Sequence, residues 1–91
     1  MKTESQQLSK TLKTGRVLLQ PGEEVGEHST HQREEVLIIL KGQALLKKED
    51  KEILLNQGET HYIGENIKHN VINKSNNNLE YIYIVNLFSK V

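Results

Sequence analysis

Two histidines and two glutamates lie immediately before an aliphatic run in this chain. His28 and His31 fall within the segment GEHSTHQREE, and Glu34 and Glu35 directly precede VLIIL at residues 36–40. Imidazole nitrogens and carboxylate oxygens bind divalent transition metals, but a charged segment before a core strand is usually just hydrated. The segment is therefore either half of a metal site or a solvated segment that precedes a buried strand.

Cysteine is absent, so thiolate metal sites and disulfides are excluded. Any metal must be held by histidine, by a carboxylate or by neutral oxygen. Two further histidines follow in the chain, His61 in THYI and His69 in HNVIN. His61 is interpreted as an ordinary strand residue, whereas His69 is a candidate ligand.

Short strands separated by turn residues are predicted from residue 15 onward. The predicted strands are residues 16–20, 36–40, 43–48, 52–56, 60–63, 69–73 and 79–88. Gly, Asn, Asp and one Pro-Gly pair mark the turns between them, and no segment shows convincing helical periodicity. Strand following strand about every ten residues favours an all-β sandwich or barrel.

Alternation along these strands predicts which side chains share the interior. If Glu35 faces inward, Leu37 and Ile39 do so as well and form an apolar floor beneath the carboxylate. If His69 faces inward, so does Val71. Two imidazoles and a carboxylate that converge inside a small barrel suit Mn, Fe, Ni, Cu or Zn.

His31 does not fit strict alternation with His28. Thr30 shares the face of His28, and His31 lies on the other face unless the strand bulges or has already turned. Bulges are common beside active sites because they redirect a side chain. We expect His31 to be a ligand, with Thr30 lining the pocket as the alternative.

The spacing of these residues resembles the two sequence motifs of the cupin family. The matching residues are Gly22, His28, Glu35 and Gly42 in the first motif, and Gly58, His69 and Asn73 in the second. Thr30 stands where the family has its second histidine, and Gly64 and Asn66 replace a proline and a glycine. The resemblance covers about residues 15 to 88 and predicts a small single-domain cupin.

The resemblance implies an all-β double-stranded β-helix, a jelly-roll barrel whose cavity lies between two sheets. Family members of this size include dioxygenases, isomerases and sugar-binding modules, so the fold alone does not decide the function. With His28, His31, Glu35 and His69 as ligands, we expect a metalloenzyme that acts on a small oxygen-bearing molecule. Glu35 is alternatively a catalytic base if it does not bind the metal. A non-enzymatic module that binds or senses a small ligand is the second hypothesis, and a structural dimer is the third.

Chain length and charge bear on the number of domains and on the kind of partner. The chain of 91 residues suggests one barrel domain at residues 14–91 after a polar arm at residues 1–13. Acidic and basic residues number 12 each, which gives no charge-based reason to expect a nucleic-acid or membrane partner. The polar beginning of the sequence is not typical of a secretory signal, so we expect a cytoplasmic protein.

Two predicted strands are apolar on both faces, at residues 36–40 and 81–87. A strand with one hydrated face should alternate between apolar and polar residues. Either the core is thick, or the outer face of the sheet is buried in a homodimer. The small size of the domain favours the homodimer.

Overall fold

The computed structural model describes residues 1–6 and 11–86, which fold into nine strands. The strands are β1 (Lys2–Gln6), β2 (Leu12–Leu19), β3 (His28–Ser29), β4 (Glu35–Lys41), β5 (Gln43–Lys48), β6 (Lys51–Asn56), β7 (Thr60–Ile63), β8 (Lys68–Ile72) and β9 (Leu79–Asn86). Within these residues no helix occurs that is long and apolar enough to cross a lipid bilayer. The predicted all-β class is confirmed.

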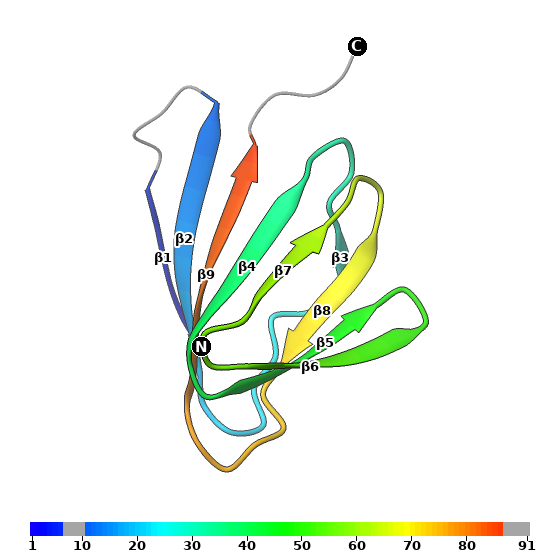
Figure 1. Ribbon diagram of the computed structural model, residues 1–91. Coiled ribbons are helices and arrows are strands. Elements are labelled where there is room, and N and C mark those ends of the chain that lie inside the picture. The colour runs from blue at the N-terminus through cyan, green and yellow to red at the C-terminus, as the bar shows by residue number, and fades with distance from the viewer. Residues whose placement is uncertain (7–10, 87–91) are drawn as a thin grey trace.

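The strands form two antiparallel sheets that face each other as a jelly-roll barrel (Figure 1). One sheet has five strands in the order β1-β2-β9-β4-β7, and the other has four in the order β3-β8-β5-β6. The chain passes from one sheet to the other between β4 and β5. Strands distant in sequence thus become neighbours, as where β9 lies between β2 and β4.

Inward side chains from both sheets form one apolar core. Its fully buried members include Leu19, Leu37, Ile39, Leu46, Ile63 and Leu79. In β4 the alternation is as predicted, because Leu37 and Ile39 are buried while Val36 and Ile38 are only half-buried. Glu35 begins the same strand and shares the inward face, at the end of the barrel where the core gives way to a cavity.

The first strands differ from the sequence-based expectation. Pairing with β9 extends β2 back to Leu12, across the polar residues that precede the predicted strand at residues 16–20. Residues 2–6, expected to belong to a polar arm, form β1 and pair antiparallel with β2 of the same chain. These contacts join part of the arm to the barrel sheet, and the boundary predicted after residue 13 stays a prediction. Residues 7–10 lie outside the described part of the chain.

The outer face of the five-stranded sheet is partly apolar. Val36 pairs with Ile84, and Ile38 pairs with Ile82, so four aliphatic side chains form one patch. All four are half-buried within the single chain. The double-sided apolar character of these strands is therefore real, and the core accounts for only one of their faces.

Candidate metal centre

Two of the predicted ligands are cross-strand neighbours. The short strand β3 pairs with β8 so that His28 lies directly opposite His69. Their ring centroids are 4.2 Å apart, and the ring planes meet at 62°. The register of one short strand thus brings together two imidazoles from distant parts of the sequence.

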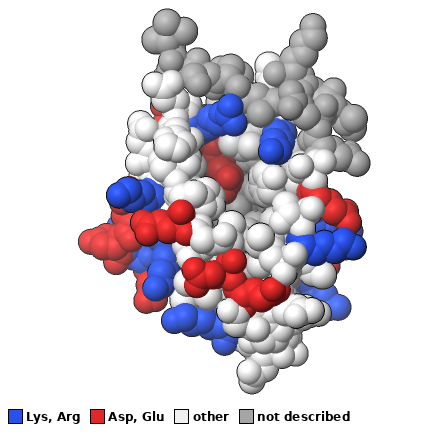
Figure 2. Space-filling model, turned by 180° about the vertical axis from the view of Figure 1, so that it is seen from behind, with Lys and Arg blue, Asp and Glu red and all other residues white. Residues whose placement is uncertain are grey.

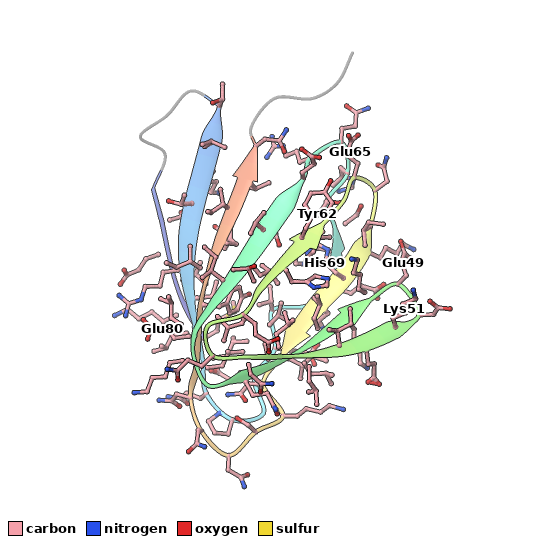
Figure 3. All side chains as sticks on the ribbon, in the orientation of Figure 1. Glu49, Lys51, Tyr62, Glu65, His69 and Glu80 are labelled. Atoms are coloured by element: carbon pink, nitrogen blue, oxygen red, sulfur yellow. The ribbon has the colours of Figure 1, made fainter. Side chains whose placement is uncertain are left out.

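Glu35 supplies a third group from the opposite sheet. One ligand atom from each of His28, Glu35 and His69 lies within 4.8 Å of the others. Oε2 of Glu35 is 3.4 Å from Nε2 of His69, and Figure 3 shows the His69 ring between the two sheets. The structure therefore brings together three of the four predicted ligands.

Backbone carbonyls fix the orientation of both imidazole rings. Nδ1 of His28 is 2.8 Å from the carbonyl oxygen of Gly26, and Nδ1 of His69 is 3.0 Å from that of Ile67. A carbonyl oxygen can only accept a hydrogen bond, so each Nδ1 carries the hydrogen and donates it. When the rings are neutral, each Nε2 keeps a lone pair, which is the arrangement typical of metal-binding histidines.

The surroundings of His69 fit a metal ion. The residue is 2% exposed, and within the described part of the chain its Nε2 has no hydrogen-bond partner. The approach of Glu35 is an ion-pair contact that lacks hydrogen-bond geometry. A buried polar atom without a partner is costly unless another group satisfies it. Two imidazole nitrogens and a carboxylate oxygen are a donor set that a first-row divalent metal accepts.

The charge of Glu35 also affects the protonation of His69. Burial lowers the pKa of the imidazole, as does the nearby charge of Lys48. The Glu35 carboxylate and the Ile67 carbonyl outweigh both, so the pKa of His69 lies above the ordinary value of a histidine. In the metal-free protein, a proton therefore competes for the atom that would bind the metal.

The chain also matches a known family across most of its length. A family model described as "Cupin domain" matches residues 15–85. The chain belongs to the cupin family. A comparison with curated proteins finds no match.

Solved structures show how closely this cupin follows the family fold. A predicted oxalate decarboxylase from Thermotoga maritima is 24% identical, with a TM-score of 0.83 over 94% of this chain and 81% of that one. An RmlC-like cupin from Methanocaldococcus jannaschii is also 24% identical, with a TM-score of 0.83 over 90% and 75% of the two chains. The Cnp3 cupin domain from Schizosaccharomyces pombe is 11% identical, with a TM-score of 0.88 over 94% and 64%. These likenesses confirm the double-stranded β-helix.

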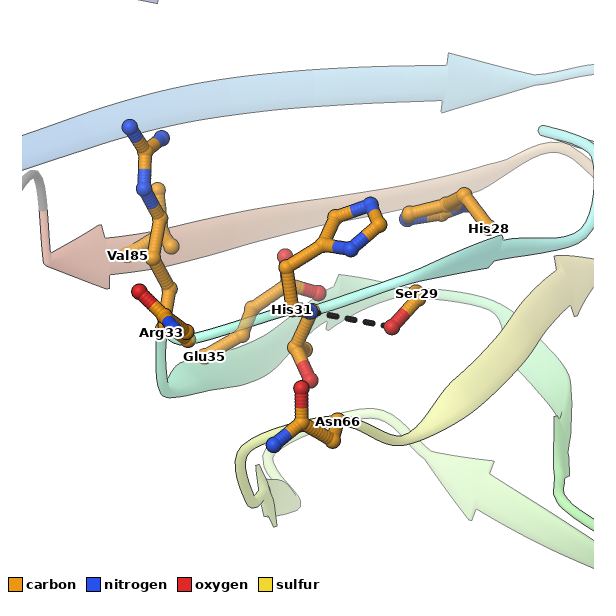
Figure 4. A pocket seen from close by; sticks show the side chains of 9 residues that line it. His28, Ser29, His31, Arg33, Glu35, Asn66 and Val85 are labelled. Carbon is orange, nitrogen blue, oxygen red and sulfur yellow. Dashed lines mark hydrogen bonds between the residues drawn. The ribbon is translucent and has the colours of Figure 1, made fainter. Parts of the chain in front are cut away.

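The turn after β3 separates Thr30 from His31 in this cupin. Thr30 is buried, and its Oγ1 donates to the Gly64 carbonyl at 2.6 Å and accepts from the Ile67 amide at 3.1 Å. His31 has a φ of 54° and is exposed at the mouth of the cavity, on the same side as His28 (Figure 4). Its ring is not one of the converging groups. Ligation by His31 stays a prediction, and it would require the ring to turn inward.

Two other candidate groups contact partners outside the site. Glu34 accepts a hydrogen bond of 2.7 Å from the hydroxyl of Tyr62, which settles the choice between adjacent glutamates in favour of Glu35 as the inward residue. Nε2 of His61 is 3.2 Å from Nζ of Lys48. Burial, and then the Lys48 charge, lower the pKa of His61, so the neutral ring accepts a hydrogen bond from the ammonium group.

Asn70 supports His28 from the outer side of β8. Its Oδ1 accepts a hydrogen bond of 2.8 Å from the Gly26 amide, and its Nδ2 donates to Oε1 of Glu24 at 3.1 Å. Gly26 is the residue whose carbonyl holds Nδ1 of His28. Nothing in the sequence pattern indicated this role, because alternation places Asn70 on the face opposite His69.

Replacing Asn70 with alanine is expected to weaken metal binding about 10- to 100-fold, as losses of supporting hydrogen bonds do at other metal sites. The physical reason is that Gly26 loses its anchor and no longer holds the His28 ring. Isothermal titration with Zn²⁺ measures the affinity, and Asn56→Ala, an exposed asparagine outside the site, is the matched control. Equal affinities for the two variants would contradict a supporting role for Asn70.

The cavity of this cupin has two parts that meet at the converging ligands. The mouth has a volume of about 600 Å³ and is lined largely by polar residues, among them His31, Arg33 and Asn66. An inner chamber of about 280 Å³ lies between the sheets. His28 and Glu35 border both parts, so a molecule in either part lies beside the converging groups.

Tyrosines form part of the inner chamber. Tyr81 and Tyr83 line it, whereas Tyr62 is 54% exposed on the outer face, so the structure shows which tyrosines reach the cavity. Burial first, and then the charge of Glu35, raise the pKa of Tyr81 well above its usual value. Its hydroxyl therefore stays protonated and can donate a hydrogen bond into the chamber.

Proposed function

We propose that this cupin is a small metalloenzyme whose metal is held by His28, Glu35 and His69. The observation that carries the proposal is the convergence of their ligand atoms within 4.8 Å at the border of a cavity. The donor set suits Mn, Fe, Ni, Cu or Zn. Such a metal would supply Lewis acidity toward a small oxygen-bearing molecule, or bring that molecule together with dioxygen.

Residues of the chain itself prepare the site for this chemistry. The Gly26 and Ile67 carbonyls orient the two imidazoles before anything binds. Apolar side chains of the core lie beneath Glu35, and His69 is buried beside them, so electrostatic interactions on this side of the site are stronger than in water. If Glu35 stays off the metal, its carboxylate is placed to act as a general base toward a molecule in the mouth.

A second candidate function is the binding or sensing of a small ligand without turnover. One observation favours it: His31, displaced from the position of the family's second histidine, lies outside the converging group, so this chain departs from the family's ligand pattern. Stable coordination without catalysis needs the same residues and the same cavity. Only a measurement of turnover separates the two functions.

The test is metal analysis followed by oxygen uptake. Protein purified without added metal is expected to contain about one first-row ion per chain. Reloading with Fe²⁺ or Mn²⁺ and adding a panel of small carboxylates and enols should give oxygen consumption or product formation. Metal without turnover of any member of the panel would favour the binding module, and protein without affinity for any of these ions would overturn the metalloenzyme.

Metal binding is expected to weaken as the pH falls. His69 must lose its proton to ligate, and its raised pKa means that protonation begins at a higher pH than for an ordinary histidine. Zn²⁺ affinity should therefore fall by up to about tenfold per pH unit below that pKa, in titrations from about pH 8 to about pH 5.5. In the metal-free protein the sign is opposite, because the raised pKa stabilises the fold at low pH and this contribution is lost as the pH rises through it. A pH-independent affinity would contradict ligation by His69.

The apolar patch on the five-stranded sheet supports a homodimer as part of the proposal. The patch, formed by Val36, Ile38, Ile82 and Ile84, is continuous across two paired strands, and burial against a second copy would remove it from water. Light scattering that gives the mass of a single 10.5 kDa chain would exclude the dimer. A cytoplasmic location stays a prediction from the sequence.

A further inference from the structure

The mouth of the cavity carries positive charge without paired acidic partners. Arg33 lines it and is exposed. Lys13 lies opposite Val85 in the register of β2 and β9, and Val85 also lines the mouth. Neither cation forms an ion pair with any other residue that the structure describes. Figure 2 shows basic side chains on both sides of a hollow in the upper part of the molecule, with an acidic side chain within it.

The acidic group that borders the mouth is Glu35. With a divalent metal held by this carboxylate and two neutral imidazoles, the centre keeps a net positive charge. The cations at the rim and the positively charged metal centre therefore both favour a negatively charged ligand. A guanidinium group binds a carboxylate through two parallel hydrogen bonds, so Arg33 suits a carboxylate in particular.

The inner chamber favours a different kind of chemical group. Val17, Val25 and Val71 supply much of its wall, and the rings of Tyr81 and Tyr83 supply more. A chamber of about 280 Å³ accommodates a short alkyl chain or a single aromatic ring. Removing such a group from water is favourable. A sugar would find few hydrogen-bond partners on this part of the wall besides Thr3 and the two tyrosine hydroxyls.

We infer that the ligand of this cavity is a small monocarboxylate with an apolar tail. The carboxylate lies in the mouth beside Arg33, and the tail passes the converging groups into the inner chamber. The atoms next to the carboxylate then lie beside His28 and Glu35, which border both parts of the cavity. The inference rests on the proposed function and names the substrate class of the same site.

The experiment is a ligand series titrated into Zn²⁺-loaded protein and followed by NMR chemical shifts. The probes are acetate, pentanoate, benzoate and 1-pentanol. Pentanoate and benzoate are expected to bind about tenfold or more tightly than acetate, which lacks the tail, and than 1-pentanol, which lacks the charge. Arg33→Gln should remove the advantage of pentanoate over 1-pentanol, whereas Lys51→Gln, at the exposed tip of the β5–β6 hairpin, should leave it unchanged.

Val25→Phe should fill the chamber and weaken pentanoate and benzoate while sparing acetate. If that variant does not fold, the comparison of acetate with pentanoate in the unchanged protein carries the same test. Acetate binding as tightly as pentanoate, or 1-pentanol binding as tightly as pentanoate, would overturn the inference. Metal content is measured in the same samples. Metal-loaded protein that shows no preference for carboxylates would overturn this inference alone. Protein that takes up no metal would overturn the proposed function.

Discussion

Replacing His69 with alanine is expected to remove the bound metal almost completely. The imidazole is buried and its Nε2 has no described hydrogen-bond partner, and among the described residues only His28 and Glu35 converge with it. The loss should exceed the roughly 10- to 100-fold effect of disturbing a residue that only supports a ligand. Elemental analysis of the purified protein, together with Zn²⁺ titration, measures the effect.

His61→Ala is the matched control for this experiment. His61 is another strand histidine, half-buried where His69 is fully buried, and its ring contacts Lys48 instead of the converging groups. The control should keep its metal, and circular dichroism should show both variants folded. Full metal content in His69→Ala, with the fold intact, would disprove the assigned site.

Replacing Asn73 with alanine is expected to lower the free energy of unfolding by about 3 kcal/mol, a large effect for a single substitution. The side chain is fully buried, and its Nδ2 donates to the carbonyls of Leu19 and Asn77 at 3.0 and 2.8 Å. Its Oδ1 accepts from both the amide and the hydroxyl of Ser75. Alanine would leave several of these buried groups without partners, at about 1–3 kcal/mol for a group that stays dry.

Asn76→Ala in the same loop is the control. Asn76 is exposed, so its loss should change the free energy of unfolding by no more than about 0.5 kcal/mol. Urea unfolding of both variants and the unchanged protein gives the comparison. A small effect at both positions would mean that water replaces the Asn73 hydrogen bonds.

Two of the three converging groups could be predicted because they lie on regular strands. Period-2 alternation correctly placed Glu35 with Leu37 and Ile39, and placed His69 with Val71. The spacing of the motif residues then indicated that the two strands meet, although they belong to opposite sheets. The first inference needed only the two-residue repeat of side chains along a β-strand, and the second needed only the strand arrangement of the family.

Residue 31 could not be placed by the same rules. His31 adopts a left-handed backbone conformation, with φ at 54°, which is uncommon for residues other than glycine, although asparagine, aspartate and histidine adopt it more often than the rest. A pattern of polar residues predicts a turn but not its dihedral angles, so it does not fix the direction of a side chain within it. Arg33, in the same segment, was missed at the mouth for the same reason.

The sequence pattern also could not predict irregular turns and very short strands. β3 spans two residues and exists through its pairing with β8, so its own residues carry no strand signal. The predicted strands 43–48 and 52–56 leave three residues between them, but the turn is tighter, because Lys51 already pairs with Lys48 and Glu49 takes a φ of 56°. Tertiary pairing decides such details, and local propensity does not.

Gly42 shows how the structure explains a motif glycine. Its φ of 87° is unfavourable for any residue with a side chain. An added Cβ would also overlap the backbone carbonyl of Asn78. The turn between the sheets and the loop before β9 therefore pack closely, which accounts for a glycine at this place.

Gly15 has a comparable effect on the cavity, although it does not line it. Gly15 pairs directly with Tyr83, and a Cβ at this position would overlap the tyrosine ring. A larger residue at 15 would force that ring to move, and the ring forms part of the chamber wall. Chamber size is thus adjustable from a backbone position behind the wall, which offers evolution or a protein engineer a route to new ligand selectivity that leaves every ligating and charged residue untouched.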